Sequence, residues 1–126
     1  MAAYDKPRLK SSFKASVDLS AKQYFAVKAD SETTVVLAGG ASGDQITGIL
    51  MNKPVAGVAA EIAGSGGGAL LEITGTIAID GLIMITTGGT GIAATGAGAI
   101  VSARAKKAGV TGDIIPVDVI DAILHA

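Results

Sequence analysis

The strongest candidate for chemistry in this sequence is a glycine-rich run, Gly89-Thr90-Gly91-Ile92-Ala93-Ala94. It follows an apolar segment that we expect to be a strand, Leu82–Thr87, and its spacing matches a dinucleotide-binding pattern that ends in Ala. In such a site a helix begins at the glycines and points its N-terminal amides at the pyrophosphate. Gly96 and Gly98 follow at once and would weaken that helix, because glycine costs about 1 kcal/mol inside one. We therefore predict a glycine hairpin and no cofactor.

A second candidate lies near the C-terminus, where Asp118, Asp121 and His125 stand at spacings of three and four. On a helix these residues would share one face and could hold a metal ion. The polar face of any amphipathic terminal segment has the same appearance, so we expect no metal site. The period of Val117–Ala126 fits either a strand or one short terminal helix, and both stay open.

The sequence contains no set of residues that we expect to act together in catalysis. His125 is the single histidine and the penultimate residue, which is a poor position for a base. Glu61, Glu72 and Asp80 fall in separate predicted strands or turns, so no pair of carboxylates is expected to act together. The chain has no Cys, which excludes a thiolate nucleophile, a disulfide and a Cys-based metal site. We expect that the protein is not an enzyme.

Charge and hydropathy restrict the partners. Lys plus Arg is 10 and Asp plus Glu is 11, and this balance argues against a nucleic-acid partner. The small cluster of Arg104, Lys106 and Lys107 has no aromatic neighbour and is interpreted as a solvated turn. Gly81–Ala103 is an uncharged stretch of 23 residues, but six are Gly and four are Thr, which does not suit a spanning helix. We expect no membrane segment.

The positions of these residues depend on the elements around them. A chain of 126 residues fits one domain, and 49% apolar residues with 18 Gly favour short strands and turns over a helical bundle. We predict an all-β fold, a small Gly-rich β-barrel or sandwich. The predicted strands are Gln23–Lys28, Thr33–Leu37, Ile46–Met51, Ala59–Ala63, Leu70–Thr74, Leu82–Thr86, Ala99–Ala105 and Ile114–Val117.

The first sixteen residues differ from the rest. They hold four of the ten basic residues against a single acidic one, and so short a segment cannot bury enough surface to order itself alone. We therefore predict an extended N-terminal arm, 1–16, ahead of a single β domain, 17–126. Met1–Lys14 is basic and polar with no apolar run behind it, unlike a secretory signal, and we expect synthesis in a cytoplasm.

A set of short segments between residues 19 and 117 forms a known pattern. These segments are Leu19-Ser20 with Tyr24, Ala26-Val-Lys28, Val35-Val-Leu-Ala38, Ile46-Thr-Gly-Ile-Leu-Met-Asn-Lys-Pro54, Gly57-Val-Ala-Ala-Glu-Ile62 with Gly64, Ala103-Arg-Ala-Lys-Lys-Ala-Gly109 and Gly112-Asp-Ile-Ile-Pro-Val117. Through them the chain resembles the capsid decoration (cement) proteins of tailed bacteriophages. The similarity covers most of residues 14 to 118 and carries no catalytic signature.

The resemblance implies a virion structural protein that assembles, often as a homotrimer, on the outer surface of an expanded icosahedral capsid. It would bridge neighbouring major capsid protein subunits and stabilise the shell. We hypothesise that the arm orders against the capsid, with its basic residues on acidic surface and its aromatic residues in pockets. The expected capsid contacts are Tyr4, Lys6, Arg8, Lys10, Phe13 and Lys14. The alternatives are a phage tail or fibre component and a small ligand-binding module that uses the Gly88–Gly98 loop.

Overall fold

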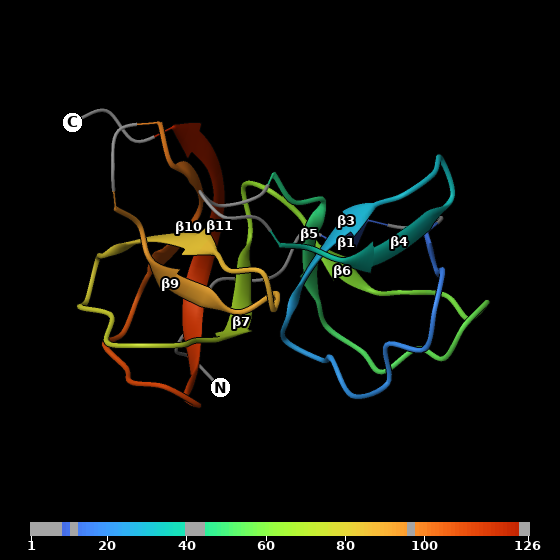
Figure 1. Ribbon diagram of the computed structural model, residues 1–126, viewed down its shortest axis with the longest axis horizontal. Helices are drawn as coiled ribbons and strands as arrows, with labels where there is room; N and C mark the ends of the chain where they lie inside the picture. Colours follow the sequence, from blue (N-terminus) through green and yellow to red (C-terminus); the bar gives the residue numbers. More distant parts are fainter. Residues whose placement is uncertain (1–8, 11–12, 40–44, 96–97, 124–126) are drawn as a thin grey trace.

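Short strands form the regular structure of this chain, as its composition predicts. The computed structural model describes residues 9–10, 13–39, 45–95 and 98–123, and within them the fold is all-β without a helix. The strands form two sheets that lie side by side along the long axis of the molecule (Figure 1). The first sheet has the order β1-β6-β5-β3-β4-β2 and the second has the order β7-β11-β10-β8-β9.

The strand boundaries divide the chain into a first half and a second half, one for each sheet. The first sheet consists of β1 (Leu9–Lys10), β2 (Lys14–Ala15), β3 (Ala26–Ala29), β4 (Thr34–Leu37), β5 (Gly48–Leu50) and β6 (Ile62–Ala63). The second consists of β7 (Gly68–Glu72), β8 (Leu82–Ile85), β9 (Gly91–Ala93), β10 (Ile100–Ala105) and β11 (Ile114–Ile123).

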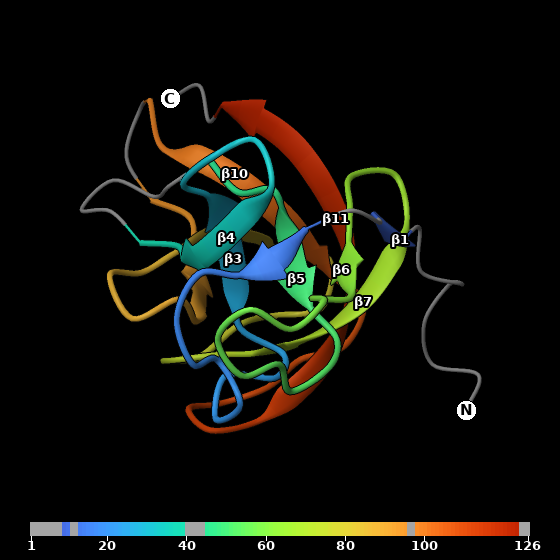
Figure 2. The same cartoon turned by 90° about the vertical axis from the view of Figure 1, so that its right-hand side faces the viewer.

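The first sheet is apolar on both faces. Adjacent residues of one strand point to opposite faces, and in β5 both Ile49 and Leu50 are fully buried. Ile49 belongs to a main core that continues into the second half, whereas Leu50 belongs to a smaller outer core. Figure 2 looks onto this half of the molecule. The outer core consists of Ala15, Leu19, Val27, Val35, Leu50, Ala60 and Ile62, with Phe13 packed against it.

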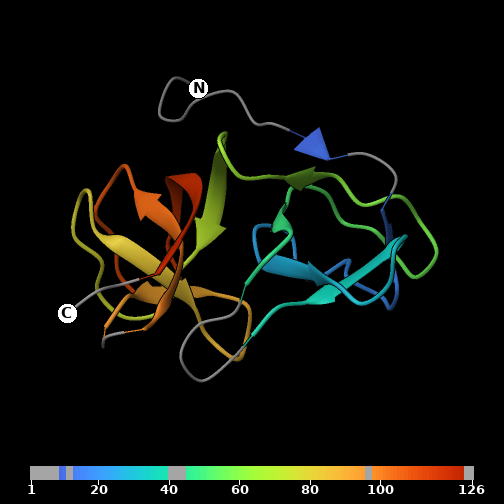
Figure 3. The ribbon, with the colours of Figure 1, turned by 90° about the horizontal axis from the view of Figure 1, so that it is seen from above.

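The N-terminal segment supplies both edges of the first sheet. β1 pairs antiparallel with β6 at one edge, and β2 pairs in parallel with β4 at the other. Figure 3 shows β1 lying alongside β6. Ala15 is only 2% exposed, and the amide of Ala60 donates to the carbonyl of Phe13 at 3.0 Å. The described part of the predicted arm is thus hydrogen-bonded to the sheet.

The second sheet curls until its two edges meet. Ile73, just after β7, pairs with Gly91 in β9, and the amide of Thr74 donates to the carbonyl of Gly91 at 2.7 Å. Gly91 is required there by close packing, because a Cβ atom would lie 2.7 Å from side-chain carbons of both Ile83 and Leu71. The second half is therefore barrel-like, in agreement with the predicted class.

Two backbone hydrogen bonds join the halves on either side of Phe25. The amide of Glu72 donates to the carbonyl of Tyr24, and the amide of Ala26 donates to the carbonyl of Gly89, both at 2.9 Å. Tyr24 has a positive φ of 71°, which is uncommon for a residue with a side chain. This backbone conformation directs the chain between the two sheets at the point where they meet.

The structure decides between the two conformations, strand and helix, that the sequence left open for the C-terminal segment. β11 extends from Ile114 to Ile123, so of the two alternatives for Val117–Ala126 the strand is right, and the short helix is wrong, as far as the described residues extend. β11 lies between β7 and β10 and pairs with both, and these tertiary pairings decide its conformation. In the part of the chain that the structure describes, no helix could cross a membrane.

Candidate functional site

The glycine run folds as the hairpin that we predicted. Its turn connects β8 to β9, with the amide of Thr86 donating to the carbonyl of Thr90 at 2.9 Å. Gly89 has a φ of +82°, a conformation that glycine adopts without steric cost. β9 begins at Gly91, so a strand follows the turn where a dinucleotide site needs a helix N-terminus. The run therefore lacks the geometry of that site.

The predicted C-terminal metal set loses its geometry with the helix. Asp118 and Asp121 lie in β11, where the helical spacing no longer applies, and His125 lies outside the described residues. The Asp118 carboxylate is instead 3.7 Å from the Lys106 ammonium. In the described ranges, no group of three or more His, Cys, Asp or Glu residues could hold a metal ion.

The remaining charged residues of interest are distributed over both halves. Glu61 precedes β6, Glu72 ends β7, and Asp80 lies in the turn before β8 with a φ of 62°. Arg104 lies in β10 rather than in a turn, and its register partner is Asp118. Lys107 is exposed in the turn after β10. The structure brings none of the three carboxylates together as a pair.

The expected capsid-contact residues are described only in part. Tyr4, Lys6 and Arg8 lie outside the described residues. Lys10 is in β1, and the exposed Lys14 is in β2, where its amide donates to the carbonyl of Thr33 at 2.9 Å. Phe13 is half-buried against the outer core of its own chain. The capsid contacts of these residues stay a prediction.

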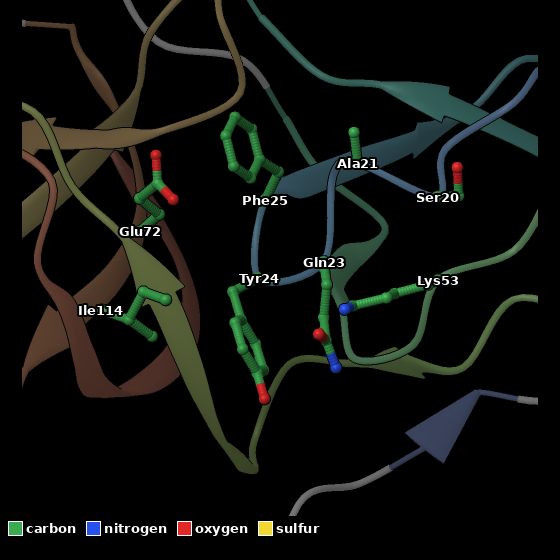
Figure 4. Close-up of a pocket in the computed structure, with 8 residues that line it drawn as sticks. All are labelled: Ser20, Ala21, Gln23, Tyr24, Phe25, Lys53, Glu72 and Ile114. Carbon is green, nitrogen blue, oxygen red and sulfur yellow. The ribbon is translucent and has the colours of Figure 1, made fainter.

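A pocket at the junction of the two halves was not predicted from the sequence. It has a volume of about 240 Å³, and we call it the junction pocket (Figure 4). The first half contributes the segment that leads into β3 and a lysine after β5, and the second half contributes Glu72 and Ile114. Its lining residues are Ser20, Ala21, Gln23, Tyr24, Phe25, Lys53, Glu72 and Ile114.

Backbone and side-chain hydrogen bonds hold one wall of the junction pocket in place. The Tyr24 amide donates to the carbonyl of Leu50 at 2.7 Å, while its carbonyl accepts from Glu72. The Gln23 side-chain amide donates to the carbonyl of Met51 at 3.0 Å. The Lys22 ammonium lies 5.0 Å from the centre of the Phe25 ring, within the range of a cation–π contact. The wall formed by residues 22–25 is therefore preorganised.

The charged groups of the junction pocket have opposite signs. Figure 4 shows Glu72 and Ile114 on one side of Tyr24, and Gln23 and Lys53 on the other. Glu72 is half-buried and Lys53 is exposed. The pocket thus offers a carboxylate, an ammonium and an aromatic ring within one small cavity. This combination of a few polar groups with apolar lining is typical of a binding pocket.

The sequence contained one signal for this pocket. Tyr24 and Phe25 are adjacent in a chain with only two Tyr and two Phe, and the sequence places them in a predicted strand. The positive φ of Tyr24 depends on contacts with the second half, which periodicity cannot reveal. No family model matches this chain, and no curated protein matches its sequence.

Proposed function

We propose that this protein is a virion structural protein that decorates the outer surface of an icosahedral phage capsid and stabilises it by bridging major capsid protein subunits. The all-β fold agrees with the compact β-fold that the family resemblance implies. In this proposal the protein assembles as a homo-oligomer, often a trimer in the family, and binds neither nucleic acid nor a membrane. It is made in the host cytoplasm and functions in the virion.

The observation that supports this proposal best is the distribution of exposed apolar side chains. Among the residues whose burial the structure describes, six large apolar side chains are between 46% and 63% exposed, three in each half of the molecule. Single exposed apolar residues are common, but groups of them indicate contact surfaces. The first group is Val17, Val55 and Val58, and the second is Ile79, Val110 and Ile114.

Hydrogen bonds hold together the segments that carry each group. In the first half, the amide of Ala15 donates to the carbonyl of Val58 at 3.0 Å, and the amide of Leu19 donates to that of Pro54 at 2.9 Å. In the second half, Ile77 and Gly109 pair as an antiparallel bridge. A protein that bridges two subunits needs two separate contact surfaces, and these two groups suit that role.

Co-sedimentation with empty capsids of the parent virus tests the proposal. The purified protein is mixed with expanded and with unexpanded capsids, and its oligomeric state is measured alone by light scattering. We expect saturable binding to expanded capsids, with a copy number that the binding curve supplies. Binding to neither form would contradict the proposal and would favour a tail or fibre component or a ligand-binding module.

A truncation tests the predicted arm within the same assay. Residues 9–16 should be kept, because β1 and β2 belong to the first sheet. We expect that deletion of residues 2–8 weakens capsid binding and leaves Tm unchanged. Unchanged binding after this deletion would remove the arm from the proposal while leaving the decoration function intact.

A further inference from the structure

The junction pocket borders the second group of exposed apolar side chains, and one of its lining residues is close in sequence to the first group. Ile114 lines the pocket and is also a member of the second group, at 46% exposed. Lys53, at the other side of the pocket, is two residues before Val55 of the first group. A capsid subunit that contacts the second group at Ile114 therefore also reaches the pocket.

The size of the pocket restricts what can enter it. Cavities that bind drug-sized molecules measure about 300–1,000 Å³, and the junction pocket is smaller, at about 240 Å³. That volume accommodates one side chain of a partner protein. Tyr24, Phe25 and Ile114 line the pocket and supply apolar contact area, and aromatic residues are enriched at the centres of protein interfaces.

The charged groups of the pocket determine which residues a complementary partner carries. Within the described residues, neither the Glu72 carboxylate nor the Lys53 ammonium forms a hydrogen bond or an ion pair. Glu72 is already half-buried, so a partner that covers the pocket would remove the remaining contact of its carboxylate with water. Covering a charge without supplying an opposite charge is unfavourable. A complementary partner therefore carries a basic group for Glu72 and an acidic group for Lys53.

We infer that the junction pocket docks one aliphatic or aromatic side chain of the major capsid protein, flanked by a basic residue that pairs with Glu72 and an acidic residue that pairs with Lys53. This inference rests on the proposed function and names the contact through which it operates. The preorganised wall at residues 22–25 reduces the ordering cost of that contact.

Charge-reversal variants test the inference in the capsid-binding assay. The pocket variants are Glu72→Lys and Lys53→Glu, and the matched controls are Glu32→Lys and Lys107→Glu, which make the same charge changes at exposed positions outside the pocket. Charge pairs at an interface often contribute enough for a loss of tenfold or more when one member is removed. We expect each pocket variant to weaken binding to expanded capsids at least about tenfold, and each control to stay within about twofold.

A steric variant gives a second readout that leaves charge unchanged. Ala21 is exposed and lines the pocket, so Ala21→Trp should occupy the cavity without disturbing either core. We expect it to weaken capsid binding with an unchanged Tm, and the Tm of every variant is measured as the control for folding. If the wild-type protein binds expanded capsids and all three pocket variants bind equally well, the inference is wrong and the decoration function stands. If the wild-type protein does not bind, both are overturned.

Discussion

The two sheets of this protein bury their apolar residues in different ways. The second sheet curls until β7 and β9 meet through Ile73 and Gly91, so its inner face encloses much of the main core. The first sheet stays open, and its outer face is covered by chain segments around residues 13–19 and 54–60. The second, closed sheet is stabilised by close packing on its inner face, whereas the first, open sheet is stabilised by segments that cover its outer face. This difference predicts that truncating a side chain in the main core lowers stability more than the same truncation in the outer core.

The largest expected effect on the free energy of unfolding comes from truncating one buried leucine in each core. Leu71 in the main core and Leu50 in the outer core are both fully buried. Leu71→Ala should lower the free energy of unfolding by about 3–5 kcal/mol, because the closed barrel cannot collapse onto the cavity. Leu50→Ala should cost about 2–3 kcal/mol, because the covering segments can relax. Urea denaturation measures both, and equal losses would contradict the comparison.

Gly91 tests the closure of the second sheet directly. Its missing Cβ leaves room for Ile83 and Leu71, so Gly91→Ala should lower the free energy of unfolding by about 1–3 kcal/mol through overpacking. Gly88 is the control in the same hairpin, because a Cβ there would meet nothing closer than the Thr86 hydroxyl at 3.8 Å. Gly88→Ala should change stability by less than about 0.5 kcal/mol. A neutral Gly91→Ala variant would mean that the barrel is loosely closed.

The elements that the sequence could predict are those formed by residues that are close together in the chain. Apolar runs bounded by turn residues predicted Thr33–Leu37, Leu82–Thr86 and Ala99–Ala105, and each contains an observed strand. The predicted strands Gln23–Lys28 and Thr33–Leu37 correspond to β3 and β4, which pair as a hairpin in which the amide of Asp30 donates to the carbonyl of Thr34. These elements are local, because neighbouring residues supply both the apolar pattern and the turn.

The elements that the sequence missed depend on distant partners. β1 and β2 lie in a polar segment whose strand pairing comes from β6 and β4. β9 lies within the predicted glycine hairpin but was not given bounds as a strand, and Pro116 made β11 look shorter than it is. Pro116 is tolerated because it lies opposite Lys106, one residue past the end of β10. The junction pocket belongs to this class as well, since it exists only where the two halves meet.

Phe13 tests whether the N-terminal segment covers the open sheet. Its half-buried ring packs on the outer core, so Phe13→Ala should lower the free energy of unfolding by about 1–2 kcal/mol. Val17 in the same segment is 51% exposed and serves as the control, and Val17→Ala should cost less than about 0.5 kcal/mol. A Phe13→Ala variant with wild-type stability would show that this segment is an arm independent of the body.

The smallest expected effect is a pH dependence that arises in the open half. Hydrogen bonds from the Thr34 and Ser16 side chains lower the pKa of Asp30, and bonds from Ser20 lower the pKa of Asp18. A carboxyl whose pKa is lower in the folded state stabilises that state above its unfolded pKa of about 3.9, and the contribution is lost as the pH falls below it. Tm should therefore decrease below about pH 4, and Asp30→Asn should reduce the decrease. Because both carboxylates are exposed, the effect should be small and weaker in high salt. If Asp30→Asn left the acid side of the Tm profile unchanged, the hairpin of the open sheet would not be held by this carboxylate, and the pH sensitivity would have to arise elsewhere in the fold.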